Sequence, residues 1–349
     1  MPSHPLYGWA VVRHEEIRRL RINHDGGGET PFGFKWPMPY GRSVRYDHTN
    51  DLTYFQTLDP SNGIRKVYEV SPSPADPRPG RYLQADGKTF GAVAFGPATG
   101  GPPLLYGADP ETSLLYEFGA PAGKGADLSR NDKWTAFHVL EGWEVWQRDQ
   151  IADLALYALK GSSGEPTLTA FVLSGPSAQE PHTTHLLIKS LRLEGPAPVV
   201  LECPTHARVV GMDPHQSYAW LSGERSELCR VYLDGTSTVE PLKHRCSTPA
   251  VFARARDAVW AVFLDDATLR GVDVTDPRKS FTIAAPNEGA WGRALIGGTG
   301  GDLVWTLQGT ENGICQYEWD LTERTCVDLG PLSFPFPSDG ELLDGLDDQ

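Results

Sequence analysis

One element recurs along the chain: a short β-forming run that carries an aromatic residue and ends in a turn rich in Gly or Asp. The clearest copy is LVWTLQG, and two further β-like runs, ICQYEWDL and RTCVDLG, follow it across polar turns. Seven such runs carry the aromatic residues Phe55, Tyr106, Phe137, Phe171, Trp220, Phe263 and Trp305, at spacings of 31 to 51 residues. Runs of this kind bounded by Gly, Asn and Asp predict strands joined by tight turns.

A unit of about 42 residues with three or four strands indicates a blade of a β-propeller. One four-stranded sheet cannot bury both of its faces, so neighbouring sheets must stack with the aromatic residues between them. We therefore predict an all-β chain folded as a β-propeller with seven blades, with six or eight blades as alternatives. The two short spacings beside Phe137 fit least well, and residues 107–165 are expected to hold an abbreviated blade or a helical turn.

The ends of the chain are expected to lie outside the repeat, which spans 41–332. Residues 1–40 are predicted to contain a closing strand at 7–12, a short helix in RHEEIRRLRI and an aromatic loop. The strand at 7–12 would close the ring by completing the last blade after RTCVDLG, because an open propeller leaves two unpaired sheet edges. Residues 333–349 are acidic and rich in turn residues, which predicts a frayed tail.

The dipeptide Trp319-Asp320, at the end of ICQYEWDL, resembles the WD dipeptide of WD-repeat propellers. The corresponding positions in other units read Leu-Asp (233–234), Asp-Val (273–274) and Glu-Phe (117–118). The upstream Gly-His pair of that family is not evident. The resemblance covers about 41–332 and implies a WD-like propeller in the broad sense. It points to no specific family, so no functional residues are carried over.

Composition and charge exclude several functions. A net charge of −14 over 349 residues argues against binding to nucleic acid or to an anionic membrane surface. No run approaches 18 apolar residues, and the N-terminus lacks the pattern of a signal peptide, so we expect a soluble cytoplasmic protein.

The five cysteines are scattered and lack the CxxC spacing of zinc sites, which predicts reduced, buried thiols and no metal. A disulfide between Cys315 and Cys326 is the alternative.

Arginines recur at a similar offset before the aromatic runs. They are Arg45, Arg130, Arg208, Arg254 and Arg293. This position predicts the first strand of each unit, which lines the central channel of a propeller. Arginine suits carboxylates and phosphates because its guanidinium can donate two parallel N–H hydrogen bonds to their oxygens. Two interpretations stay open: the arginines bind an anionic ligand, or they pair with aspartates between blades. Those aspartates would be Asp47, Asp132, Asp213 and Asp257.

Other polar and aromatic candidates are few. His48 and His206 are the histidines best placed for general acid–base chemistry. His182 and His185 are three apart, which puts them on opposite faces of a strand and disfavours a metal site. Trp36 and Tyr40, in the loop TPFGFKWPMPYGR, would either contact a ligand at the channel or plug one end of the propeller.

The sequence contains no GxSxG, HExxH, P-loop or dinucleotide-binding motif, and no cofactor is predicted. We therefore expect a binding platform for a protein or an anionic ligand, at the central channel or the top face. The alternative is an enzyme at the channel mouth, a lyase, cyclase or hydrolase that acts on an anionic small molecule with His48 or His206. The sequence leaves the choice between binding and catalysis open.

Overall fold

The structure is a computed structural model that describes the strands of the chain and some of the turns beside them. The described residues are 6–12, 16–22, 28–35, 41–47, 52–58, 65–70, 81–82, 90–96, 105–118, 134–140, 151–160, 166–175, 183–191, 197–203, 208–212, 218–222, 226–233, 239–246, 250–255, 258–265, 268–284, 291–297, 303–310, 313–320, 324–327 and 341–346. Side chains are described in most of strands β8–β15, β17–β19 and β21–β23. Within these ranges, no helix is long and apolar enough to cross a membrane.

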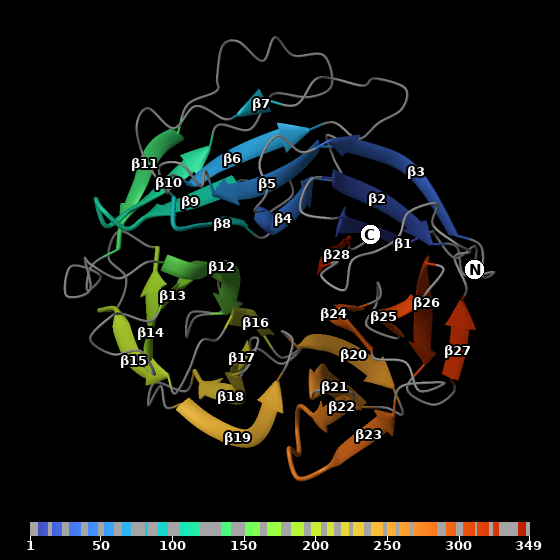
Figure 1. Cartoon of the computed structure of the whole chain (residues 1–349). Helices are drawn as coiled ribbons and strands as arrows, with labels where there is room; N and C mark the ends of the chain where they lie inside the picture. Colours follow the sequence, from blue (N-terminus) through green and yellow to red (C-terminus); the bar gives the residue numbers. More distant parts are fainter. Residues whose placement is uncertain are drawn as a thin grey trace. The chain divides into compact units, whose positions relative to one another are not determined.

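All strand pairs in these ranges are antiparallel, and the strands form seven four-stranded sheets (Figure 1). The chain divides into two compact units. The first unit comprises Met1–Tyr40, Gly223–Arg225 and His244–Gln349, and the second comprises Gly41–Ser222 and Ser226–Lys243.

The second unit holds four sheets, each built from consecutive strands; the last three residues of β19 belong to the first unit. The strands are β4 (Gly41–Asp47), β5 (Leu52–Leu58), β6 (Arg65–Val70) and β7 (Arg81–Tyr82); β8 (Ala92–Phe95), β9 (Leu105–Asp109), β10 (Leu114–Phe118) and β11 (Trp134–Val139); β12 (Ile151–Lys160), β13 (Pro166–Ser174), β14 (Thr184–Ser190) and β15 (Val199–Cys203); and β16 (Arg208–Met212), β17 (Tyr218–Ser222), β18 (Ser226–Tyr232) and β19 (Val239–Cys246).

The first unit holds three sheets, one of which contains strands from both ends of the chain. The strands are β1 (Leu6–Val12), β2 (Glu16–Ile22), β3 (Gly28–Lys35) and β28 (Glu341–Leu346); β20 (Val251–Ala255), β21 (Ala258–Asp265), β22 (Thr268–Asp273) and β23 (Ser280–Ala284); and β24 (Trp291–Gly297), β25 (Leu303–Thr310), β26 (Gly313–Asp320) and β27 (Arg324–Val327).

The terminal segments differ from the sequence-based expectations. The segment expected to be a short helix forms strand β2, which pairs with β1 on one side and β3 on the other. Pairing on both edges satisfies the backbone of β2 and overrides a weak helical pattern. The tail expected to fray contains β28, which pairs with β1. Residues 7–12 therefore pair with β28 and not with β27, because the β24–β27 sheet already has four strands.

Both faces of the β12–β15 sheet are buried within the second unit. Leu154, Val172 and Leu187 pack with residues of the β8–β11 sheet. Phe171 and Leu173, on the opposite face of β13, pack with residues of the β16–β19 sheet. The sheets lie side by side in this order (Figure 1). Since side chains alternate between the faces of a strand, a continuous apolar run such as AFVL (170–173) packs against both neighbouring sheets.

Six of the seven repeat aromatics lie on the second strand of their sheets, and Phe137 is the exception. Those with described side chains are Tyr106 on β9, Phe171 on β13, Trp220 on β17 and Phe263 on β21, all at most 3% exposed. This confirms that these aromatic residues are packing residues. Phe55 and Trp305 also lie on second strands, β5 and β25, but their side chains are outside the described residues.

Phe137 was wrongly assigned to a unit of its own. It lies on β11, the fourth strand of the β8–β11 sheet, and is 41% exposed. Its ring contacts that of Tyr106, with centroids 5.4 Å apart. The short spacings on either side of Phe137 therefore arise because Tyr106 and Phe137 belong to the same sheet. Within 107–165, where an abbreviated blade or a helical turn is expected, the described residues contain strands β9 to β12 and no helix. Residues 119–133, 141–150 and 161–165 lie outside the described residues.

Aspartates close two of the turns, as the polar turn composition suggests. Asp109 Oδ1 accepts the backbone N–H of Glu111 at 2.9 Å, between β9 and β10. Asp273 Oδ1 accepts the backbone N–H of Thr275 at 2.8 Å and its hydroxyl at 2.7 Å, between β22 and β23. A buried carboxylate that caps a turn in this way fixes the direction of the next strand.

The two-sided burial of the β12–β15 sheet predicts a contrast between two valines. Val172→Ala removes a fully buried side chain between sheets and should lower the free energy of unfolding by about 2 kcal/mol. Val200→Ala, on the outer strand β15 where the side chain is 39% exposed, should change it by less than about 0.5 kcal/mol. Urea unfolding followed by circular dichroism measures both, and equal losses would contradict the packing described.

Candidate functional site

Four of the predicted arginines lie on the first strand of a sheet. They are Arg45 on β4, Arg208 on β16, Arg254 on β20 and Arg293 on β24. Their side chains are outside the described residues, so the structure places them by backbone position. Within each unit the first strands are neighbours: β8 lies beside β4 and β12, β12 beside β16, and β24 beside β20 and β28. In the first unit, Arg254 and Arg293 therefore lie on neighbouring strands. In the second unit, β8 and β12, which bear none of these arginines, lie between β4 and β16.

The four arginines do not share one position along their strands: Arg254 is one residue before the end of its strand, Arg45 is two residues before it, and Arg208 and Arg293 are four residues before it. Arg254 is the residue before the last of β20 and faces Val259 of β21. Arg208 is the first residue of β16 and faces Ser222 of β17. Relative to the end of its own strand, Arg208 lies three residues further back than Arg254, or about 10 Å at the rise of a β-strand.

The remaining predicted site residues lie outside the described residues. They are His48, His206, Trp36, Tyr40 and Arg130. Of the histidine pair, His185 lies on β14, where its backbone N–H donates to Ser174 Oγ at 2.8 Å. His182 is outside the described residues. The described part of the chain contains no group of three or more His, Cys, Asp or Glu that could hold a metal ion.

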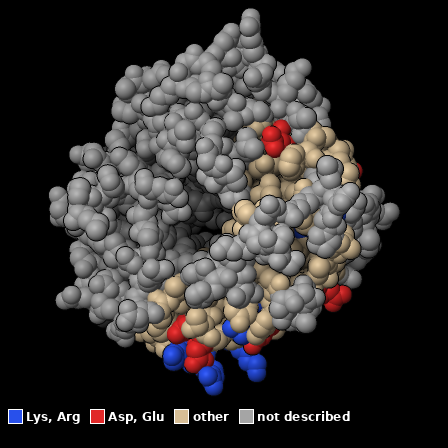
Figure 2. All heavy atoms as spheres, turned by 180° about the vertical axis from the view of Figure 1, so that it is seen from behind, with Lys and Arg blue, Asp and Glu red and all other residues tan. Residues whose placement is uncertain are grey.

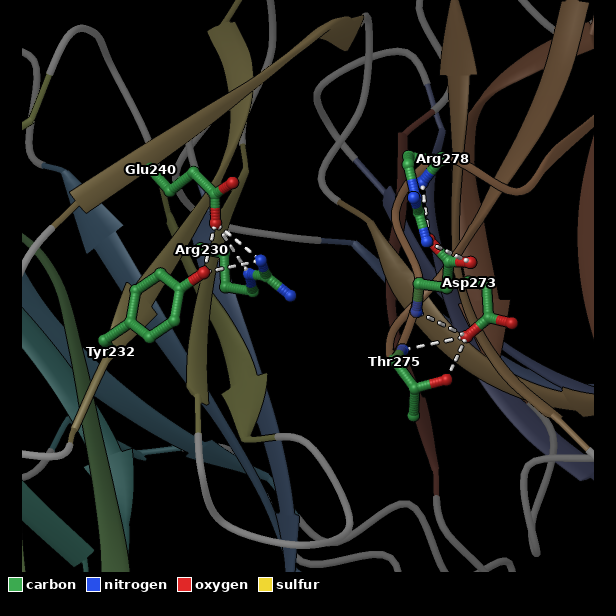
Figure 3. Close-up of polar contacts among 7 residues, drawn as sticks. Arg230, Tyr232, Glu240, Asp273, Thr275 and Arg278 are labelled. Carbon is green, nitrogen blue, oxygen red and sulfur yellow. Dashed lines mark hydrogen bonds and ion pairs between the residues drawn. The ribbon is translucent and has the colours of Figure 1, made fainter.

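A polar cluster in the β16–β19 sheet was not found from the sequence (Figure 3). Arg230 donates from Nε and Nη2 to Glu240 Oε2, at 3.0 and 2.6 Å. Its Nη2 also donates to Tyr232 Oη at 2.7 Å, and the tyrosine hydroxyl donates to the same Glu240 oxygen at 2.6 Å. The guanidinium carbon lies 4.6 Å from the ring centre of Tyr218 and 5.0 Å from that of Tyr232. One arginine thus ties three strands together.

The electrostatics of this cluster favour the ionised pair. Hydrogen bonds from Tyr232 and then Arg230 lower the pKa of Glu240 below its usual value of 4.5. The hydrogen bond to Glu240 raises the pKa of Tyr232. Because Arg230 is already engaged by a carboxylate, a hydroxyl and two aromatic rings, the cluster acts as a cross-strand tie. The pattern ELCRVY places Arg230 and Tyr232 on one face of β18, but it does not reveal their partner on β19.

Other described cations also have acidic partners. Arg270 pairs with Asp265 at 2.6 Å, and Arg278 pairs with Asp276 at 2.8 Å. In the space-filling view, the described Lys and Arg side chains lie among Asp and Glu side chains (Figure 2). The part of this face that the structure describes therefore presents mixed charge and no extended basic patch.

Three of the five cysteines have described side chains, and all three are buried thiols. They are Cys203, Cys229 and Cys246. Burial raises the pKa of the Cys203 thiol from 9.0 to about 12, so it stays protonated at neutral pH and is a poor nucleophile. The prediction of reduced, buried thiols is confirmed for these residues. The side chains of Cys315 and Cys326 lie outside the described residues.

Comparisons with known proteins identify the fold and not the family. No protein-family model matches the chain, and no curated protein matches its sequence. Among solved structures, a Lactobacillus plantarum protein is similar over 97% of this chain and 99% of its own, with a TM-score of 0.55 and 12% identity. A Bacteroides uniformis protein provisionally named a 6-phosphogluconolactonase is similar over 98% of this chain and 100% of its own, with a TM-score of 0.54 and 13% identity.

The C-terminal WD40 domain of Sif2 is also similar, over 99% of this chain and 84% of the other, with a TM-score of 0.50 and 10% identity. WD40 domains are β-propellers of four-stranded blades, which matches the four-stranded antiparallel sheets of this chain. At such low identities the similarity shows the fold alone. The chain has a β-propeller fold, and the broad resemblance to WD-like propellers is confirmed at that level.

The Arg230 cluster predicts a pH-dependent stability difference. Glu240→Gln removes the charge that Arg230 and Tyr232 engage and should lower the free energy of unfolding by about 1 kcal/mol at pH 7, a value reduced by the partial exposure of Glu240. Since the pKa of Glu240 is lowered on folding, its contribution is present above about pH 4.5 and is lost as the pH falls below that value. Urea unfolding at several pH values measures this difference.

Glu202→Gln is the matched control, since Glu202 is an exposed residue on β15. The role of the cluster would be refuted if Glu202→Gln lowered the free energy of unfolding as much as Glu240→Gln does. It would also be refuted if the loss in Glu240→Gln persisted unchanged at pH 3.

Proposed function

We propose that the chain is a seven-bladed propeller, closed by the pairing of β1 with β28, that binds an oxyanionic ligand along its first strands. Seven four-stranded sheets among the described strands support the blade number. The pairing of Ala10 with Leu342 joins the two ends of the chain in one sheet, which supports closure. The ligand is an anionic small molecule or an acidic segment of a partner protein, which share carboxylate or phosphate groups.

One observation carries this proposal: arginines occupy the first strands of four sheets, and two of them, Arg254 and Arg293, lie on neighbouring strands of one unit. In an acidic chain, cations gathered on adjacent strands form a local positive field that attracts anions. Arginine in particular binds carboxylate and phosphate through paired N–H donors. If the arginines were instead paired with aspartates between blades, that field would be cancelled and anions would not bind.

Thermal unfolding with added anions tests the proposal. Phosphate or citrate should raise the melting temperature in a concentration-dependent manner, relative to chloride at equal ionic strength. A ligand at a hundred times its Kd stabilises the folded state by about 2.7 kcal/mol. Arg208→Ala should reduce this shift in melting temperature measurably.

The control is Arg278→Ala, because the Arg278 side chain is 89% exposed and lies at the turn between β22 and β23. This variant should keep the full shift. The absence of any anion effect on the unmodified protein, or a full shift in Arg208→Ala, would refute the proposal.

A further inference from the structure

Arg293 lies in an irregular segment of its strand. Trp291 of β24 faces Gln308 of β25, and Leu295 faces Thr306. Three residues of β24 therefore lie opposite a single residue of β25, and the register shifts between them. Arg293 is the central residue of the three, so it has no Cα partner on β25.

Arg254 provides the contrast within the same unit. Strand β20 pairs with β21 without interruption, from Val251 opposite Val262 to Ala255 opposite Ala258, and Arg254 faces Val259. Strands β20 and β24 are neighbouring first strands. The two arginines therefore both lie on first strands but differ in backbone setting.

The physical consequence of the bulge is a residue released from the regular alternation of the ladder. Bulges bend a strand and change the direction available to a side chain, and they are common beside binding and active sites.

Register shifts also occur near two of the other arginines. One lies between Gly41 and Ser43 of β4, the strand of Arg45. Another lies between Val209 and Gly211 of β16, next to Arg208. A shift in β12, which bears no arginine, shows that irregular first strands are a general feature of this fold, while the insertion of two extra residues around Arg293 is larger.

We infer that Arg293 is the principal anchor for the oxyanion, an assignment that rests on the proposed function. The bulge frees Arg293 from the ladder register, whereas Arg254 remains in it. The group bound is a carboxylate or a phosphate, whose oxygens match the paired donors of a guanidinium. Arg254 supplies general positive charge from the neighbouring strand.

Phosphate binding by matched variants tests this assignment. Inorganic phosphate is titrated calorimetrically into the unmodified protein, Arg293→Gln and Arg254→Gln, with circular dichroism to confirm folding. Arg293→Gln should weaken phosphate binding at least tenfold, and Arg254→Gln less than about threefold. Arg293→Lys keeps the positive charge but lacks the paired N–H donors of a guanidinium, so its affinity for phosphate should still fall several-fold. Arg254→Lys should bind phosphate as tightly as the unmodified protein does.

The outcomes separate the two claims. If the unmodified protein binds neither phosphate nor citrate, the proposed function and the anchor assignment both fail. If it binds phosphate and Arg254→Gln loses as much affinity as Arg293→Gln, or Arg293→Lys binds normally, the anchor assignment is wrong while the proposed function stands. Should Arg293→Gln fail to fold, the two lysine variants decide the assignment.

Discussion

The burial of both faces of a four-stranded sheet is the constraint on which the rest of this structure depends. In the β12–β15 sheet, Val172 packs toward one neighbouring sheet and Phe171 and Leu173 toward the other. Such a sheet has no stable face to present to water, so it requires a neighbour on each side. The stacking leaves the first strands of adjacent sheets close to one another, which is where the arginines lie. Packing of the sheets and placement of the candidate site thus follow from the same requirement.

The repeated aromatic run was sufficient to predict the fold class, because buried second strands need a large apolar residue at a fixed place. Tyr106, Phe171, Trp220 and Phe263 satisfy that rule. Phe137 satisfies the same local pattern on a fourth strand, where it is partly exposed. Local pattern cannot distinguish these settings, since strand order within a sheet depends on pairing over long sequence distances. The same limit explains the terminal strands: nothing local in residues 341–346 indicates that β1 is their partner.

The candidate site was predictable only in part: the strand that carries each arginine could be predicted, but its position in the register could not. A similar offset from the aromatic run predicted that Arg45, Arg208, Arg254 and Arg293 lie on first strands, and they do. Their heights, and the bulge around Arg293, depend on hydrogen-bond register, which a hydrophobic pattern does not specify when both faces are apolar. The tie between Arg230 and Glu240 was missed because its partners come from different strands. Arg230 is already engaged by Glu240, Tyr232 and Tyr218, so we assign ligand binding to the first-strand arginines.

A crystal structure grown in the presence of inorganic phosphate tests the central claim most directly, since it shows the anion, the arginines and their partners together. The account predicts phosphate density along the first strands, within hydrogen-bond distance of the Arg293 guanidinium. First-strand arginines paired with aspartates between blades, and no phosphate beside them, would contradict it.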